Sequence, residues 1–187
     1  MVGAVSRVLS FACLPLALLF VACSSADGSS ATGAPPSGGS SNDDAVPRGA
    51  ADVSLSGCPK AGQLLTVGRM SPLTTIESGQ ADERGRATIV TCNIVGGHVH
   101  GLIQSVPVGS LMLDATLDAS GASSAATIEA SAVTAEAMWS SASCTLAPLS
   151  NSATSYRASF HCAGATNPGE DTCDVTGEID LEQCAQQ

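Results

Sequence analysis

The chain has 187 residues and a formal net charge of −10 at pH 7, so it has room for one domain of ordinary size. Its seven Lys and Arg residues are scattered along the sequence. This argues against binding of nucleic acid or of an anionic lipid surface, because either would need clustered basic side chains. Aromatic residues make up only 3% of the chain, so the core must come from small aliphatic side chains. Cross-links among the eight cysteines would help to stabilise such a core.

Residues 1–22 have the pattern of an export signal. A short first segment carries one positive charge, Arg7, and residues 8–20 are apolar apart from Ser10. This run is too short to cross a bilayer as a helix, which takes roughly 20 residues. We therefore interpret residues 1–22 as a cleaved signal peptide rather than as a membrane span.

The signal ends in LFVAC, residues 19–23, which resembles a bacterial lipobox. Phe20 departs from the family's pattern, which prefers Leu there, and the resemblance covers only the signal region. Membership among bacterial lipoproteins implies that the thiol of Cys23 receives diacylglycerol, that the chain is cleaved before it, and that a further acyl chain such as palmitate follows. Two or more chains anchor a protein stably.

Cleavage by the ordinary signal peptidase after Ala26 is the alternative, and it would yield a secreted protein. Ser24 follows the cysteine in place of the aspartate that resembles an inner-membrane retention signal. This favours the outer membrane, if the host has one.

The segment 23–51 is predicted to be a disordered tether behind the lipidated cysteine. It is dominated by Ser, Gly, Ala and Pro and has no apolar periodicity, so it cannot bury enough surface to offset the entropy of ordering. A flexible coil of about 26 residues reaches roughly 25 to 30 Å from the membrane. Both a passive spacer and a glycosylated, serine-rich stalk remain open.

The remaining residues, 52–187, are predicted to form one domain of short strands. The clearest run is 173–182, where apolar residues alternate with a carboxylate-rich solvent face. Similar alternation predicts strands at 87–95, 98–106, 110–119 and 156–162. The alanine-rich stretch 123–143 has no clean helical face, and we assign it mostly to strand. Short strands with turn signals between them predict an all-β fold, an antiparallel sandwich or barrel.

Cys13 lies in the signal peptide and Cys23 is the expected lipid attachment site. The domain then keeps an even number of cysteines: Cys58, Cys92, Cys144, Cys162, Cys173 and Cys184. In an exported domain this predicts three disulfides, and the absence of CxxC spacing argues against structural zinc or a thioredoxin-like site. A continuous strand from 173 to 181 would separate Cys173 and Cys184 by about 30 Å, which excludes that pair. Six cysteines permit fifteen connectivities, of which we predict Cys162–Cys173, Cys58–Cys92 and Cys144–Cys184.

His98 and His100 are spaced two apart on a predicted strand, so both imidazoles point to one face and could chelate a metal. The tripeptide His98-Val99-His100 resembles the metal-binding HVH of copper–zinc superoxide dismutases, which are also exported β-sandwiches. That family needs several more histidines, and this chain has only His161 besides. A dismutase of that kind is therefore excluded. The alternative to metal binding is that the two histidines are solvent-facing strand residues without a ligand.

Other motifs are weak. There is no GxSxG elbow and no glycine-rich phosphate loop after a strand. Glu170, Asp171 and Asp174 could supply oxygen ligands to calcium, but they match no EF-hand spacing and are better explained as an acidic loop. Stacking of sugars needs exposed aromatic rings, and Trp139 is the sole tryptophan.

These observations predict a cell-envelope lipoprotein with a non-catalytic role, either structural or in binding a protein or cell-surface partner. We assign no catalytic residue, no cofactor and no metal site, and we expect the lipid anchor at Cys23 to make the membrane a partner. The alternative is a metal- or small-ligand-binding envelope protein that uses His98 and His100. A carbohydrate-binding module is a third possibility.

Overall fold

The computed structural model describes residues 45–59, 61–70, 73–132, 138–169 and 171–186. All of them belong to the second of the two units into which the chain divides, residues 39–187. This part of the chain forms strands and turns, and it holds no helix long and apolar enough to cross a membrane.

The strands are, in chain order, β1 (Arg48–Ser56), β2 (Gly62–Val67), β3 (Arg69–Met70), β4 (Leu73–Thr74), β5 (Ile76–Glu77), β6 (Ala87–Val95), β7 (His98–Val106), β8 (Gly109–Thr116), β9 (Ser123–Ala132), β10 (Met138–Asn151), β11 (Tyr156–Thr166) and β12 (Thr172–Glu182).

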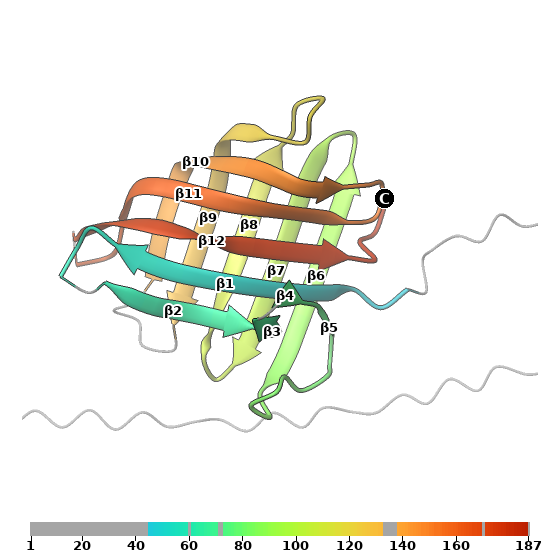
Figure 1. Cartoon of the computed structure of the whole chain (residues 1–187), viewed down its shortest axis with the longest axis horizontal. Helices are drawn as coiled ribbons and strands as arrows, with labels where there is room; N and C mark the ends of the chain where they lie inside the picture. Colours follow the sequence, from blue (N-terminus) through green and yellow to red (C-terminus); the bar gives the residue numbers. More distant parts are fainter. Residues whose placement is uncertain (1–44, 60, 71–72, 133–137, 170, 187) are drawn as a thin grey trace, which may run out of the picture. The chain divides into compact units, whose positions relative to one another are not determined.

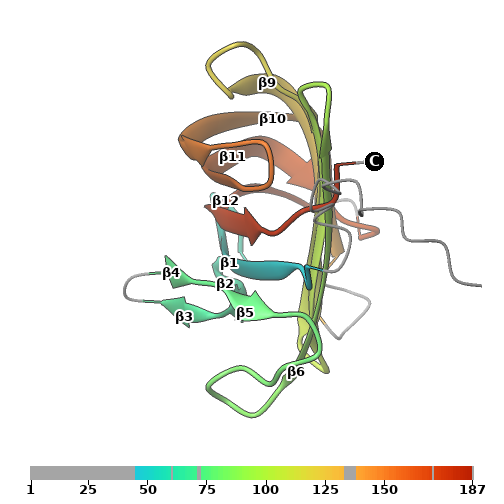
Figure 2. The same ribbon diagram turned by 90° about the vertical axis from the view of Figure 1, so that its right-hand side faces the viewer.

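The main sheet is antiparallel with the order β2-β1-β12-β11-β10-β9-β8-β7-β6, β5 pairs with β1 beside this path, and β3 and β4 form a separate two-stranded sheet. The sheet folds over on itself, so that β10, β11, β12, β1 and β2 cross in front of β6 to β9 (Figure 1), and the two layers are seen from the side in Figure 2. Register shifts in β10 after Ser141 and in β11 after Cys162 mark bulges, which bend strands and let the sheet turn over. The predicted antiparallel, disulfide-bonded all-β fold is confirmed.

The core fills the space between the layers with mostly small aliphatic side chains, and Trp139, Tyr156 and Phe160 are buried among them. The phenolic hydroxyl of Tyr156 donates a hydrogen bond to the backbone carbonyl of Gly121, 2.9 Å away. Burial, together with the charge of Asp118, raises the pKa of Tyr156 to about 12. The one tyrosine is thus a buried, neutral hydrogen-bond donor.

The outer edge of β6 is covered at both of its ends. At one end the N–H of Ala185 donates to the carbonyl of Cys92 at 3.0 Å, and the N–H of Ile94 donates to Ala185 at 2.9 Å. At the other end residues 79–80 exchange backbone hydrogen bonds with Thr88. These contacts occupy backbone groups that an edge strand would otherwise expose, and they nearly close the sheet into a barrel.

The predicted strands at 87–95, 98–106, 156–162 and 173–182 are confirmed, and 123–143 contains β9 and the start of β10. The strand predicted at 110–119 ends earlier, at Thr116, because the carboxylate of Asp118 accepts N–H groups of Ser120 and Ala122 and forms a turn. Hydrogen bonding to that carboxylate, first by the Ser120 side chain, also lowers the pKa of Asp118.

The boundary predicted at residue 52 lies inside β1, so residues 48–51 are strand and not tether. Ala50 and Ala51 are fully buried, and the side chain of Arg48 donates to the hydroxyl and the carbonyl of Thr75, just before β5, which pairs with β1. The sequence did not predict these strand residues, because they are small and resemble the tether before them in composition. The rest of the tether and the signal peptide lie outside the described residues.

All six cysteines of the domain form disulfides, as predicted, but all three predicted pairs are wrong. The bonds are Cys58–Cys173, Cys92–Cys184 and Cys144–Cys162, with Cα–Cα distances of 5.1, 4.8 and 4.2 Å. The exclusion of a Cys173–Cys184 bond is confirmed.

Strand register explains why Cys162 does not bond to Cys173. The continuous register of β11 with β12, which begins at Tyr156 opposite Leu181, sets Cys162 opposite Val175, and the bulge beyond it sets Ala165 opposite Cys173. On its other side, β11 pairs with β10 so that Thr145 faces His161, which brings the neighbouring Cys144 and Cys162 across from each other.

Candidate functional site

The hairpin of β7 and β8 gathers four polar side chains on the outer face of the back layer. Its register pairs His100 with Asp114 and His98 with Thr116. Alternation along both strands turns these four residues outward, while Ile103 faces the core.

A single carboxylate oxygen, Oδ2 of Asp114, lies between the two imidazoles. It is 3.4 Å from Nε2 of His98 and 3.2 Å from Nδ1 of His100. The other nitrogen of His98, Nδ1, lies 3.4 Å from Oγ1 of Thr116. The side chains of both histidines are 48% exposed and that of Asp114 is 46% exposed, so this His–Asp–His cluster is open to solvent.

In the observed rotamers the cluster does not enclose a point for an ion. Within the described ranges, no group of three or more His, Cys, Asp or Glu side chains is placed to hold a metal ion as the side chains stand. The six domain cysteines are held in disulfides and cannot serve as thiolate ligands. Binding of a metal by the His–Asp–His cluster would therefore require its exposed rings to turn.

A hydroxyl-rich hollow lies next to the cluster. Its volume is about 360 Å³, and it is lined by Thr127, Glu129, Ser140, Ser141, Ala142, Gly164 and Thr166. Thr127 is the cross-strand neighbour of Asp114, so the hollow begins one strand away from the His–Asp–His cluster. The arrangement joins imidazole, carboxylate and hydroxyl groups on one open face.

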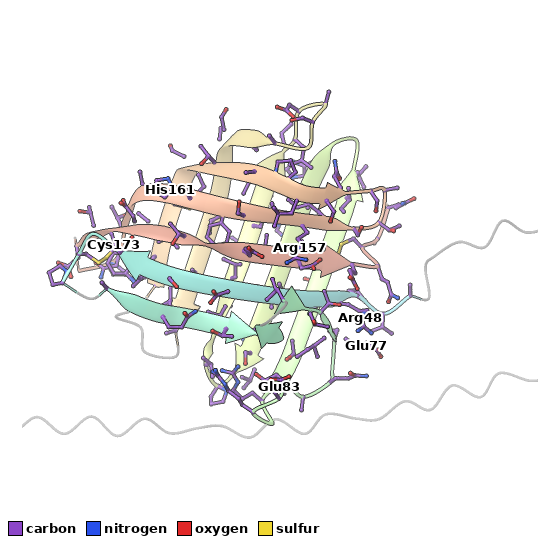
Figure 3. All side chains as sticks on the ribbon, viewed as in Figure 1. Arg48, Glu77, Glu83, Arg157, His161 and Cys173 are labelled. Atoms are coloured by element: carbon purple, nitrogen blue, oxygen red, sulfur yellow. A yellow bond between two sulfur atoms is a disulfide. The ribbon has the colours of Figure 1, made fainter. Side chains whose placement is uncertain are left out.

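The third histidine takes no part in this cluster. His161 is exposed on β11, opposite Thr176, and it lies on the front of the molecule as seen in Figure 3. Of the proposed calcium ligands, Glu170 lies outside the described residues, and the carboxylate of Asp174 accepts the N–H of Gly164 at 3.0 Å.

The front face carries an ionic network along β12, the strand predicted to present a carboxylate-rich solvent face. Arg157, labelled in Figure 3, lies 3.2 Å from Glu178 and 3.8 Å from Asp180. Asp180 is only 9% exposed, so this part of the solvent-face prediction is wrong. Burial raises the pKa of Asp180, the charges of Glu182 and Glu178 raise it further, and the positive charge of Arg157 opposes them.

A second buried ion pair closes the turn before β6. Arg86 pairs with the carboxylate of Asp82, which also accepts the backbone N–H groups of Arg84 and Arg86, and the Arg86 guanidinium donates to the carbonyl of Thr66. Burial raises the pKa of Asp82, but the hydrogen bonds and the charge of Arg86 outweigh it and hold the pKa below its ordinary value. Every polar partner here is satisfied, which indicates a structural role.

Sequence reasoning found the two histidines of the cluster and missed Asp114. The signal was present, because alternation in 110–119 places Asp114 on the polar face and Pro107 marks a turn between the two strands. A hairpin centred on that turn sets residue 100 opposite 114.

Comparisons of the chain with protein-family models, with curated proteins and with solved structures found no match.

Proposed function

We propose that this protein is a cell-envelope lipoprotein that is anchored through Cys23 and presents its β domain at the membrane surface in a structural or partner-binding role. The lipobox-like end of residues 1–23 supports the anchor. Disulfide bonding of the domain agrees with an oxidising compartment, where such bonds form and persist.

The observation that carries the proposal is the pairing of the cysteines. All six in the domain bond with one another, and Cys13 lies in the predicted signal peptide. Cys23 is thus the one cysteine of the processed chain whose thiol is not used in a disulfide and is available for acylation. Its position after Ala22 at the end of an apolar run is where acylation of a lipoprotein takes place.

Intact mass spectrometry tests the anchor. The protein is extracted from the host's membranes and its free thiols are alkylated without reduction. We expect a mass that lacks residues 1–22, gains acyl groups and gains no alkyl group. A Cys23→Ala variant is the matched control and should leave the membrane fraction. An unacylated chain that begins at a later residue would contradict the anchor.

Cross-linking tests the partner-binding role. Cross-linking of intact cells that carry the anchored protein should yield a discrete heavier adduct. The Cys23→Ala variant keeps the same β domain but is not held at the membrane, so its adduct should be weaker. An adduct of equal yield from both forms would show that binding does not depend on display at the membrane.

A further inference from the structure

We propose that His98, His100 and Asp114 bind a divalent transition-metal ion, with Zn²⁺ as the reference ion, on the outer face of the β7–β8 hairpin. The ligands are Nε2 of His98, Nδ1 of His100 and a carboxylate oxygen of Asp114. This site is independent of the lipid anchor, because all of its residues belong to the folded domain.

The three side chains of the His–Asp–His cluster lie within the range of separations that ligands of one ion have. Two atoms that bind one tetrahedral zinc at about 2.0 to 2.1 Å lie about 3.3 to 3.4 Å apart. The two N···O distances in the cluster are 3.4 and 3.2 Å. The carboxylate oxygen therefore lies within reach of both imidazoles, and rotation of the exposed rings is needed before all three groups face one ion.

An outer contact orients one of the imidazoles. Metal-binding histidines almost always donate the N–H of the nitrogen that does not bind the metal to a nearby oxygen. Nδ1 of His98 lies 3.4 Å from the hydroxyl oxygen of Thr116, which can accept this proton while Nε2 faces Asp114. Thr116 is therefore a positioning residue for the proposed site.

The backbone of the site is rigid while its side chains are free to turn. Continuous antiparallel pairing holds β7 to β8 from His98 to Ser105, and β6 and β9 flank the hairpin. The three ligand side chains are about half exposed, so their rings can rotate toward a common ion without disturbing the core. Rotation replaces the two N···O contacts with three metal–ligand bonds.

The donor set selects the class of metal. Two imidazole nitrogens and one carboxylate oxygen suit zinc and copper, whereas magnesium and calcium prefer sites built from oxygen alone. Three protein ligands leave a fourth position for water on this open face. The hydroxyl-rich hollow beside Asp114 gives a ligand of that ion a polar surface to contact.

Zn²⁺ titration of the processed protein, in competition with a chromophoric chelator, tests the site. Loss of even an outer-shell partner typically lowers metal affinity about 10- to 100-fold. We therefore expect one ion per chain, a loss of about 100-fold or more in His98→Ala/His100→Ala, and a loss of at least about 10-fold in Asp114→Asn and Thr116→Val. His161→Ala, which removes an exposed histidine elsewhere, is the matched control and should keep the wild-type affinity.

Co²⁺ supplies a second readout, because an ion bound by both imidazoles and the carboxylate in a tetrahedral site gives an intense visible absorption band. The emission of Trp139, which is 1% exposed, verifies that each variant is folded. Equal affinity in wild type and the double-histidine variant would overturn the proposal and show that the ion binds elsewhere on this acidic domain. No binding by the wild type, or only a weak octahedral Co²⁺ spectrum, would overturn it as well.

Discussion

The disulfide Cys92–Cys184 should contribute more to stability than Cys144–Cys162. Cys144 and Cys162 face each other on adjacent strands, β10 and β11, which the ladder already holds together. Cys92–Cys184 instead fixes the chain beyond β12 to the edge strand β6. We predict that Cys92→Ala/Cys184→Ala unfolds more easily than Cys144→Ala/Cys162→Ala.

The sequence separations set the size of the difference. They are 92 residues for Cys92–Cys184 and 18 for Cys144–Cys162. In the chain-entropy description these loops correspond to about 4.6 and about 3.2 kcal/mol of stabilisation. All four cysteines are buried, so the loss of their side-chain packing largely cancels in the comparison. If Ala185 also detaches from β6, two backbone hydrogen bonds worth about 1 kcal/mol each widen the difference to about 3 kcal/mol.

Equilibrium unfolding in urea, followed by the emission of Trp139, measures both variants. The midpoint should fall further for Cys92→Ala/Cys184→Ala. The dependence of the unfolding free energy on urea should also steepen more, because a denatured chain freed from the longer loop exposes more surface. An equal or larger loss in Cys144→Ala/Cys162→Ala would refute the reasoning from loop length and edge closure.

Two further predictions concern the packed interior. Gly177→Ala should destabilise the domain by about 3 kcal/mol in the same urea assay, because the added Cβ would overlap the carbonyl oxygen of Asp52. Gly169→Ala is the control. Its Cβ would meet its nearest neighbour at 3.4 Å, so this variant should change the stability little. Tyr156, the only tyrosine, should ionise near pH 12 in an ultraviolet titration of the native protein and near 10 in urea. Because the native state keeps this proton to a higher pH, the free energy of unfolding should fall as the pH rises from 10 to 12. This fall should be absent in Tyr156→Phe. A native titration midpoint near 10 would contradict burial of the hydroxyl.

The alternation of apolar and polar residues identified most of the long strands, because one face of each is buried and the other is exposed to solvent. It failed at β1, where Gly49 to Ala51 read like the tether before them. There both faces are covered, since Gly68 packs closely against the side chain of Ala50 and β5 pairs along the edge of the strand. Contacts with residues that lie far along the chain decide this burial, and no local pattern encodes it.

The disulfide pairs and the third member of the His–Asp–His cluster were missed for a related reason. Both depend on register between strands, which the sequence specifies only indirectly. The register from Tyr156 opposite Leu181 already sets Cys162 against Val175, and the bulge after Cys162 shifts Cys173 one residue further away, to a position opposite Ala165. The hairpin holding Asp114 was more accessible to prediction, because its turn is short and its strands are regular.

The register of that hairpin also links the interior to the proposed metal site. Ile103 and Leu111 face each other in the core with no exposed surface, and the same pairing sets His100 against Asp114 outside. A slip of one residue would turn the histidines inward and expose the apolar set, so core packing enforces the register. The outer cluster therefore needs no stabilising contacts of its own to keep its geometry. Substitutions at its three ligands should change metal affinity while leaving the free energy of unfolding without metal nearly unchanged.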